Sequence, residues 1–311
     1  PMLSLAAIEA LEQVGTEQQK ETYLTRLVSG EWTGAMVLTE PGAGSDLGAL
    51  TATATPNGDE TYSLTGQKIF ITWGDHDATD NIVHLVLARL PDAPKGPKGI
   101  SLFLASKFEV KPDGTLGERN SFRPVGIEHK LGIHASPTCV MAYEGARAEL
   151  VGRPNEGLAH MFVMMNAARL AVGVEGVGIA ERAYQGALAY ALDRRQGRSV
   201  WTGEASSPIF DHPDVRRSLA VMKAKISAAR AICLLTGVAA DMAEHAADET
   251  DRRRWKARED LFTPIAKAWS TDVGVEVASA GLQVHGGMGF IEETGAAQHY
   301  RDARIAPIYE G

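Results

Sequence analysis

One stretch limits what this chain can fold into more than any other: MVLTEPGAGSD, which runs over residues 36–46. Four residues with strand character lead into a Glu-Pro pair, and Gly42 and Gly44 then bracket one small residue. Proline fixes its own φ and biases the preceding residue away from the helical region, while glycine lets the backbone turn freely. The pattern therefore predicts a strand that ends in a tight loop, whose outward N–H groups can cradle a flat or anionic ligand.

Two other interpretations of this loop stay open at this point. A plain turn at a strand end is the commoner meaning of a lone GAG string. The dinucleotide-binding fingerprint GxGxxG is the other generic match, but Leu47 stands where its third glycine belongs and no helical pattern follows. The stretch therefore indicates a binding loop or a simple turn, and it argues against a Rossmann fold.

Length and charge narrow the class of protein. A chain of 311 residues is too long for most single cores and indicates two or three domains. Its composition, 44% hydrophobic and 23% charged, is ordinary for a folded globular protein. A formal net charge of −8 leaves no basic surplus to neutralise phosphates, so we expect no nucleic acid as a partner.

The cysteines and the chain ends bear on the cellular setting. Cys139 and Cys233 lie far apart among apolar residues, which favours buried free thiols in a reducing, cytoplasmic compartment. No apolar run approaches the roughly 20 residues that cross a bilayer and no signal peptide is visible, so we expect no membrane span. The sequence opens on Pro1 rather than methionine and stops at Gly311, so we expect a piece of a longer protein.

The pattern of apolar residues changes twice along the chain. Helical spacing of apolar residues predicts two short helices before Gly30, the second capped by Thr16. Short β-branched runs separated by turn signals follow, which is typical of an antiparallel barrel or sandwich. After that, long amphipathic patterns over 158–192, 214–245 and 261–284 favour an antiparallel helical bundle.

These patterns together predict an α+β fold in three parts. Residues 1–31 are expected to be the end of an N-terminal helical domain, 32–152 a middle β domain and 153–311 a C-terminal helical bundle.

Four motifs stand along the chain in a recognisable order: TEPGAGSD (39–46), GQKIFIT (66–72), QVHGGMGF (283–290) and RDARIAPIYEG (301–311). Together they resemble the signature of the acyl-CoA dehydrogenase family, and the resemblance runs from about residue 15 to the last residue. The strings EHKLGIH, MMNAARL and RRQGRS are more similar to the large bacterial branch that includes 3-methylmercaptopropionyl-CoA dehydrogenases. Members of the family normally have more helices before and after the part that is matched here.

The resemblance implies FAD as the cofactor and assigns residues to it. In the β domain, the residues that it implies as contacts of the cofactor are Met36, Leu38, Thr39, Gly44, Ser45, Phe70 and Thr72. Thr72 would lie near the reactive flavin nitrogen. Phe70 stands where many members have Trp, and either ring can stack on a flavin. Taken alone, however, an aromatic residue on a strand is more often part of a core.

From the helical domain, the resemblance implies contacts with the FAD of a neighbouring subunit through Arg194, Gln283 and Gly287. A guanidinium suits the pyrophosphate because it forms charge-assisted hydrogen bonds. The sequence departs from the family at two points. Pro213 stands near where many members carry a glutamine that contacts the cofactor, and the RRQGRS string is shorter than usual around its glycine.

The resemblance also implies the reaction, which is removal of hydrogen from the α and β carbons of a fatty acyl-CoA thioester. Glu310 is the expected base that removes the α-proton, because apolar neighbours would desolvate its carboxylate. Its backbone N–H would help to bind the thioester oxygen as charge develops there. The residues expected to contact the substrate are Ser45, Arg169, Tyr309 and Gly311.

A metal site is not expected. The GDHD string at 74–77 and the pair His129 and His134 lack the spacing of a known metal motif. Loop or capping roles are the more ordinary explanation for these residues.

The resemblance implies an electron-transfer flavoprotein as the acceptor of electrons and a homodimer or homotetramer as the assembly. Two kinds of alternative function stay open. An acyl-CoA oxidase or a flavin monooxygenase on the same fold would react quickly with oxygen, and a catalytically silent scaffold protein would not bind FAD at all.

Overall fold

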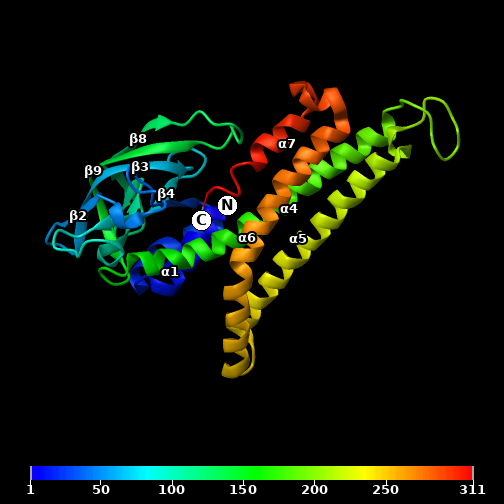
Figure 1. Cartoon of the computed structure of the whole chain (residues 1–311). Coiled ribbons are helices and arrows are strands. Elements are labelled where there is room, and N and C mark those ends of the chain that lie inside the picture. Colours follow the sequence, from blue (N-terminus) through cyan, green and yellow to red (C-terminus); the bar gives the residue numbers. More distant parts are fainter. Residues whose placement is uncertain (1, 310–311) are drawn as a thin grey trace. The chain divides into compact units, whose positions relative to one another are not determined.

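The computed structural model describes residues 2–309, which fall into two compact units. The first unit comprises residues 2–130 and 134–168, and the second comprises residues 131–133 and 169–309. Figure 1 shows that the first unit is built around strands and the second around long helices. Within the described residues, all strands belong to the first unit.

The chain begins with the two helical stretches that the sequence predicts. In α1 (Met2–Val14), small and apolar residues recur on one face and four of them are buried. Thr16 then caps the next stretch, because its side chain accepts from the Gln19 N–H and its own N–H donates to the Gln19 side chain. That stretch runs through α2 (Glu17–Gln19), a π-helical turn and α3 (Thr25–Ser29). It ends at Gly30, whose φ of 80° suits glycine.

Nine strands follow within the described residues. They are β1 (Trp32–Val37), β2 (Thr53–Pro56), β3 (Thr61–Thr72), β4 (Asn81–Arg89), β5 (Ile100–Ser106), β6 (Phe108–Val110), β7 (Leu116–Arg119), β8 (Phe122–Ile127) and β9 (Thr138–Val151). Pairing runs from β4 through β2, β3, β9 and β5 and back to β4, so five strands close a barrel. β1 extends the barrel sheet beside β4, β8 pairs with β9, and β6 and β7 form a separate two-stranded sheet.

The barrel is mixed rather than purely antiparallel. β1 and β2 run parallel to β4, whereas the other pairings in the sheet are antiparallel. The chain leaves β1 through the loop at 36–46 and returns along β2 and β3 before it enters β4, so β4 repeats the direction of β1. The α+β class is confirmed, and the middle part departs from its expected description only in these two parallel pairings.

β4 divides the core of the first unit into two layers. Val83, Leu85 and Leu87 pack on one face with α1 and with the first residues of α4 (Gly157–Asp193). The residues that alternate with them along the strand, including Ile82 and Val86, pack on the other face with Phe103 and further residues of the barrel strands. A strand that is buried on both faces requires a nearly continuous apolar run rather than alternation, and in β4 only His84 interrupts the apolar run from Ile82 to Ala88.

Three long helices make up most of the second unit: α4 from residue 169 onward, α5 (Pro213–His245) and α6 (Glu249–His285). They share one buried core with α7 (Ala296–Ala303). α6 includes the charged cluster at 251–260, whose mixed charges suit the exposed start of a helix, and it begins after the Asp248 cap. Gly286, with φ of 59°, ends α6 as expected.

Small residues let α4 and α6 approach closely. A Cβ added at Gly176 would lie 2.6 Å from the Ser270 carbonyl oxygen and 2.9 Å from the Thr271 Cα. Both atoms belong to the backbone of α6, so they cannot move aside as a flexible side chain would. The glycine is therefore required by the distance between two helices and not by its own φ.

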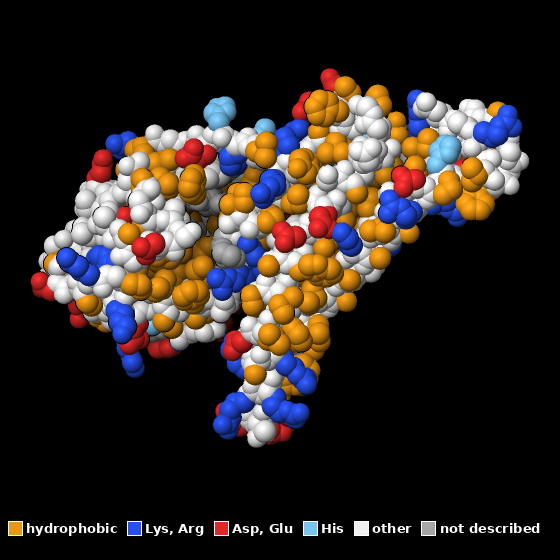
Figure 2. All heavy atoms as spheres, viewed as in Figure 1, with side chains coloured by type: hydrophobic (Ala, Val, Ile, Leu, Met, Phe, Trp, Pro, Cys, Tyr) orange, Lys and Arg blue, Asp and Glu red, His pale blue; other side chains and the backbone are white. Residues whose placement is uncertain are grey.

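α4 and α5 are each long and apolar enough to cross a membrane when only length and composition are counted. The expectation that no stretch reaches such a length is therefore wrong. This is weak evidence for a span, because core helices pass the same test and both helices contribute buried residues to one core. Figure 2 shows apolar side chains on the visible surface of α5 and α6 as well. Leu234 of α5 and Leu261 of α6 are 65% and 58% exposed.

We predict that Gly176→Ala lowers the stability of the chain by about 1–3 kcal/mol, because the added methyl overpacks the contact between α4 and α6. Gly178 lies on the same helix with open space where its Cβ would be. Gly178→Ala should therefore be neutral or stabilising by up to about 1 kcal/mol through helix propensity. Urea unfolding followed by circular dichroism compares the two. Equal effects of the two substitutions would contradict this account of the helix contact.

Candidate active site

The glycine loop closes on itself through backbone hydrogen bonds. The Glu40 N–H donates to the Ala43 carbonyl at 3.1 Å, and the Ala43 N–H donates to the Glu40 carbonyl at 3.0 Å. Pro41 and Gly42 lie between these two residues and make the turn. The loop is therefore a fixed hairpin bend at the end of β1.

Neither Gly42 nor Gly44 has a φ in the left-handed region, and a Cβ added to either would meet no atom within 4 Å. The turn therefore does not require the left-handed backbone freedom of glycine at either position. What they provide is open space beside the loop, and Ser45 next to them is exposed. Such room suits a ligand that must approach the backbone closely.

A buried ion pair fixes the loop to the barrel. The Lys68 ammonium on β3 lies 2.9 Å from Glu40 Oε1, and the two side chains are 0% and 4% exposed. The Glu40 carboxylate also accepts hydrogen bonds from the Thr51 N–H at 2.6 Å, the Thr51 hydroxyl at 2.8 Å and the Ala52 N–H at 3.0 Å. All of these groups come from the loop itself, from β3 and from the start of β2.

Burial and pairing act against each other on these two charges. Burial tends to raise the pKa of Glu40, but Lys68 and the N–H groups of Thr51 and Ala52 outweigh it and hold the pKa below its usual range. Burial lowers the pKa of Lys68 to about 8, although Glu40 opposes that change. Both groups are therefore charged at neutral pH. The sequence did not predict this pair, because the two residues are 28 positions apart in the chain.

The end of β3 bulges and turns two aromatic rings toward solvent. The register with β9 shifts between Lys68 and Ile71, and both Phe70 and Trp73 have positive φ, 60° and 52°. This conformation is rare for bulky residues and often marks a functional site. Phe70 is 59% exposed, so the interpretation of its ring as a core residue is wrong. The Ile69 N–H donates to the Thr39 carbonyl at 2.9 Å and joins the bulge to the glycine loop.

Two threonines flank this junction with unused hydrogen-bonding groups. Thr39 and Thr72 are half-buried, and neither hydroxyl has a hydrogen-bond partner within residues 2–309. Met36 and Leu38 precede Thr39 and pack against the core layer that contains α1. The loop and the bulge therefore bring polar groups, an exposed ring and open space together in one unit of the structure.

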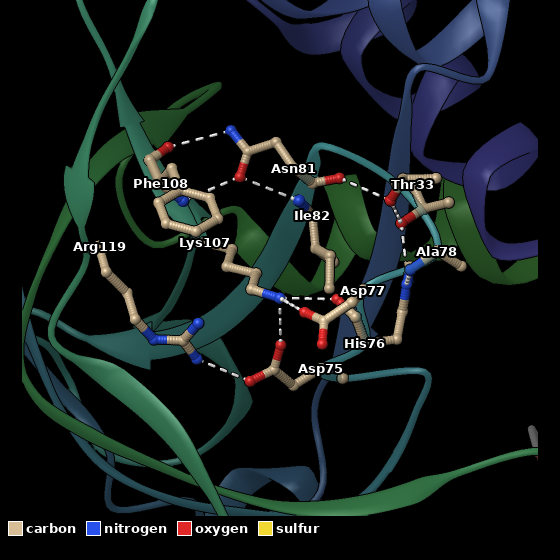
Figure 3. A network of polar contacts seen from close by, with 12 residues as sticks. Thr33, Asp75, His76, Asp77, Ala78, Asn81, Ile82, Lys107, Phe108 and Arg119 are labelled. Carbon is tan, nitrogen blue, oxygen red and sulfur yellow. Dashed lines mark hydrogen bonds and ion pairs between the residues drawn. The ribbon is translucent and has the colours of Figure 1, made fainter.

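A polar network holds the loop that follows Thr72 (Figure 3). The Lys107 ammonium lies 2.8 Å from Asp75 and 3.0 Å from Asp77, and Arg119 reaches Asp75 from the other side at 2.6 Å. The His76 ring contacts the Thr33 hydroxyl at 3.1 Å. These contacts hold the GDHD segment to β1, to β7 and to Lys107. Within residues 2–309, no cluster of three potential metal ligands is found.

His84 on β4 anchors the same loop from inside the barrel. Its Nε2 lies 2.8 Å from the Gly74 carbonyl, which can only accept, so Nε2 carries the proton. Nδ1 therefore accepts from the Tyr143 hydroxyl at 2.6 Å. His84 is fully buried, and burial lowers its pKa to about 4. Neutral His84 thus holds the backbone two residues beyond Thr72.

The helical unit carries the remaining expected residues at separate places. Arg194 follows the end of α4 and donates to the Gln196 side chain at 3.1 Å. Gln283 lies in the last turn of α6, and Gly287 lies in the 3-10 turn that follows. All three are exposed. Pro213, at one of the departures from the family pattern, begins α5.

The segment before the expected base packs within the helical unit. The Tyr309 hydroxyl donates to the Glu175 carboxylate on α4 at 2.8 Å. The Lys267 ammonium lies 6.0 Å from the centroid of the Tyr309 ring, on a side chain of α6 that is buried. Arg169 is half-buried on α4. Glu310 and Gly311 lie outside the described residues, so the roles expected for them remain predictions.

A barrel with an exposed binding loop, joined in sequence to a bundle of long helices, is the architecture expected for a flavin-dependent acyl-CoA enzyme. Residues 35–146 match the family model of the acyl-CoA dehydrogenase middle domain, and residues 155–311 match that of the acyl-CoA dehydrogenase C-terminal domain. The chain belongs to the acyl-CoA dehydrogenase family.

Known relatives agree with this assignment. The chain is 53% identical over its whole length to the 3-methylmercaptopropionyl-CoA dehydrogenase of Ruegeria pomeroyi, of which it covers 53%. It is 30% identical to the caffeyl-CoA reductase-Etf complex subunit CarC of Acetobacterium woodii, with 96% of this chain and 69% of the relative covered. The chain spans about half the length of the more similar curated relatives that it matches.

A solved structure is similar in fold as well as in sequence. The structure of butyryl-CoA dehydrogenase from Megasphaera elsdenii superposes with a TM-score of 0.80 at 32% identity. The match covers 98% of this chain and 71% of that one. The domain limits 1–31, 32–152 and 153–311 and the roles of individual site residues remain predictions.

We predict that His84 makes the stability of the chain depend on pH between about 6.5 and 4. In the unfolded chain the imidazole takes up a proton as the pH falls through its ordinary pKa, but the buried ring does so only near pH 4. Its contribution to stability is thus present above pH 6.5 and is lost as the pH falls, by about 3 kcal/mol at pH 4.

Urea unfolding at pH 7, 5.5 and 4 measures this dependence. His84→Phe should flatten the profile by that amount, whereas Tyr143→Phe removes the hydrogen-bond partner but keeps the imidazole and should keep the steeper profile. An unchanged slope in His84→Phe would show that other groups set the dependence.

Proposed function

We propose that the chain is the flavin-binding and catalytic part of an enzyme that removes hydrogen from the α and β carbons of an acyl-CoA thioester, with FAD as the cofactor. The observation that carries the proposal is the junction of the glycine loop with the bulge of β3. There, two threonine hydroxyls without partners in residues 2–309 lie beside an exposed aromatic ring. Membership of the family supports the same assignment.

The residues of the barrel unit fit a flavin. Hydroxyls such as those of Thr39 and Thr72 can donate to or accept from the ring nitrogens and carbonyls. The exposed Phe70 ring offers a face for stacking, and the open space at Gly44 lets a ligand approach the loop. Met36, Leu38 and Ser45 would complete the cofactor contacts of this unit.

We assign three exposed residues of the helical unit, Arg194, Gln283 and Gly287, to the FAD of a second subunit. The Arg194 guanidinium is a fitting donor for a pyrophosphate, because its planar group can form bidentate hydrogen bonds. This part of the proposal requires a homodimer or homotetramer.

Glu310 would take the α-proton of the thioester, and FAD when bound supplies the acceptor for the hydride that leaves the β carbon. The N–H of Glu310 would donate to the thioester oxygen, where negative charge develops. Tyr309 is oriented by its hydrogen bond to Glu175, which fixes the chain just before the base. Ser45, Arg169, Tyr309 and Gly311 would contact the substrate.

We predict that Glu310→Gln binds FAD as the wild type does but loses the bleaching of the flavin band when acyl-CoA is added. An amide keeps the size of the side chain but cannot take the proton, so the reductive step should slow by at least about a hundredfold. Anaerobic absorption spectroscopy at 450 nm, about where oxidised flavins absorb, measures both properties. Undiminished bleaching would remove Glu310 from the mechanism.

We propose a short, sulfur-containing acyl chain, as in 3-methylmercaptopropionyl-CoA, as the substrate, because the relative at 53% identity carries that name. We predict that kcat/KM for 3-methylmercaptopropionyl-CoA exceeds that for butyryl-CoA by about tenfold, the size of one well-packed group in a pocket. A panel of acyl-CoA thioesters with an artificial electron acceptor measures this preference. Equal rates for the two thioesters would discard the assignment of the substrate.

We propose an electron-transfer flavoprotein as the electron acceptor and the cytoplasm as the location. The named association of the Acetobacterium woodii relative with Etf supports the first point, and the buried free thiols of Cys139 and Cys233 fit a reducing compartment. Oxygen consumption on addition of acyl-CoA would instead favour an acyl-CoA oxidase or a flavin monooxygenase. A colourless protein that cannot be reconstituted with FAD would favour a silent scaffold.

A further inference from the structure

Every N–H group of the Lys68 ammonium is used inside the barrel unit. Besides Glu40 Oε1, the ammonium donates to the Leu38 carbonyl at 2.8 Å and to the Leu87 carbonyl at 2.7 Å. An ammonium has three donors, so these three acceptors satisfy it completely. Two of the acceptors belong to the segment that leads into the glycine loop.

The hydrogen bond to Leu38 determines which way the next amide points. In a planar trans peptide, the carbonyl and the N–H point in opposite directions. Because the Leu38 carbonyl is held inward by Lys68, the Thr39 N–H of the same peptide points away from the buried lysine.

The neighbouring peptide groups already form hydrogen bonds within the barrel unit. The Thr39 carbonyl accepts from the Ile69 N–H at 2.9 Å, and the Glu40 N–H donates to the Ala43 carbonyl at 3.1 Å. Within residues 2–309, the Thr39 N–H has no hydrogen-bond partner. The segment thus presents one fixed backbone donor beside the Thr39 hydroxyl, at the junction that the proposed function assigns to the flavin.

Resting on that proposed function, we propose that Lys68 is a positioning residue for the cofactor: it locks the peptide between Leu38 and Thr39 so that the Thr39 N–H is preorganised to donate to the flavin ring. Glu40 supplies the countercharge that lets a lysine occupy the interior. A buried ion pair is seldom the most stabilising choice for a core, since apolar residues of the same volume are often as good or better. The pair is explained by the orientation of the peptide that it holds.

The test separates this orientation from general stability by comparing two variants of the full chain. Lys68→Met combined with Glu40→Gln removes both buried charges together, so that neither is left uncompensated, and it frees the Leu38 carbonyl. Asn120→Ala is the matched control for stability, because Asn120 is a buried residue of the same unit that bonds to Ser106 and Arg147 and not to the loop.

FAD affinity is measured by titrating the apoprotein and following flavin fluorescence, together with the absorption spectrum of the bound flavin and the thermal midpoint of each apoprotein. The double variant should bind FAD about tenfold more weakly, the value of one hydrogen bond to a preorganised donor, with a shifted flavin band. Asn120→Ala should lower the thermal midpoint without changing the affinity or the spectrum.

The outcomes distinguish this proposal from the one on which it rests. Wild-type protein that binds FAD, with a folded double variant that binds it equally well and shows the same spectrum, overturns the positioning role and leaves the proposed function intact. A loss of affinity in Asn120→Ala as large as in the double variant also overturns it, because the effect would then follow stability. Wild-type protein that cannot be reconstituted with FAD overturns both.

Discussion

The buried pair of Lys68 and Glu40 is the contact on which the rest of the barrel site depends. It joins β3 to the glycine loop and, through Thr51 and Ala52, to the start of β2. Each charge has been removed from water, so each is tolerable only while the other is in place. The loop therefore cannot change its path without leaving an unpaired charge in the interior, and this makes its geometry rigid although it contains two glycines.

A second anchor acts at the other end of the same site. His84 holds the Gly74 carbonyl from within the barrel, and the network of Lys107 with Asp75 and Asp77 holds the following residues from outside. Between the two anchors, Phe70 and Trp73 keep backbone conformations that bulky residues rarely adopt. The strain at the end of β3 persists because contacts on both sides over-determine it, as is common where a protein presents groups to a ligand.

Much of the fold follows from sequence patterns, and the exceptions have physical reasons. The long helices, the Thr16 cap and the glycine that ends α6 are local features, so periodicity and capping residues suffice to predict them. The parallel pairing of β1 with β4 depends on how the intervening chain returns, which no local pattern encodes.

Part of the candidate site can also be predicted from sequence patterns, and part of it cannot. Motif order places the glycine loop and the end of β3 in one functional unit, and the Ile69–Thr39 hydrogen bond bears out their proximity. The role of Lys68 could not be predicted from its spacing, because partners 28 residues apart meet only once the barrel has closed. The role of His84 could not be predicted for a similar reason, because the residues next to a histidine in an apolar strand do not indicate its hydrogen-bond partners.

The open space beside Gly42 and Gly44 has a consequence for how variants of this protein are scored. Neither glycine is needed by the backbone, and a methyl group at either place would meet only solvent in the protein alone. A screen that scores variants by folding, expression or heat resistance would therefore pass alanine at both positions as harmless. Only a screen that measures ligand binding can detect the effect of a methyl group in this space.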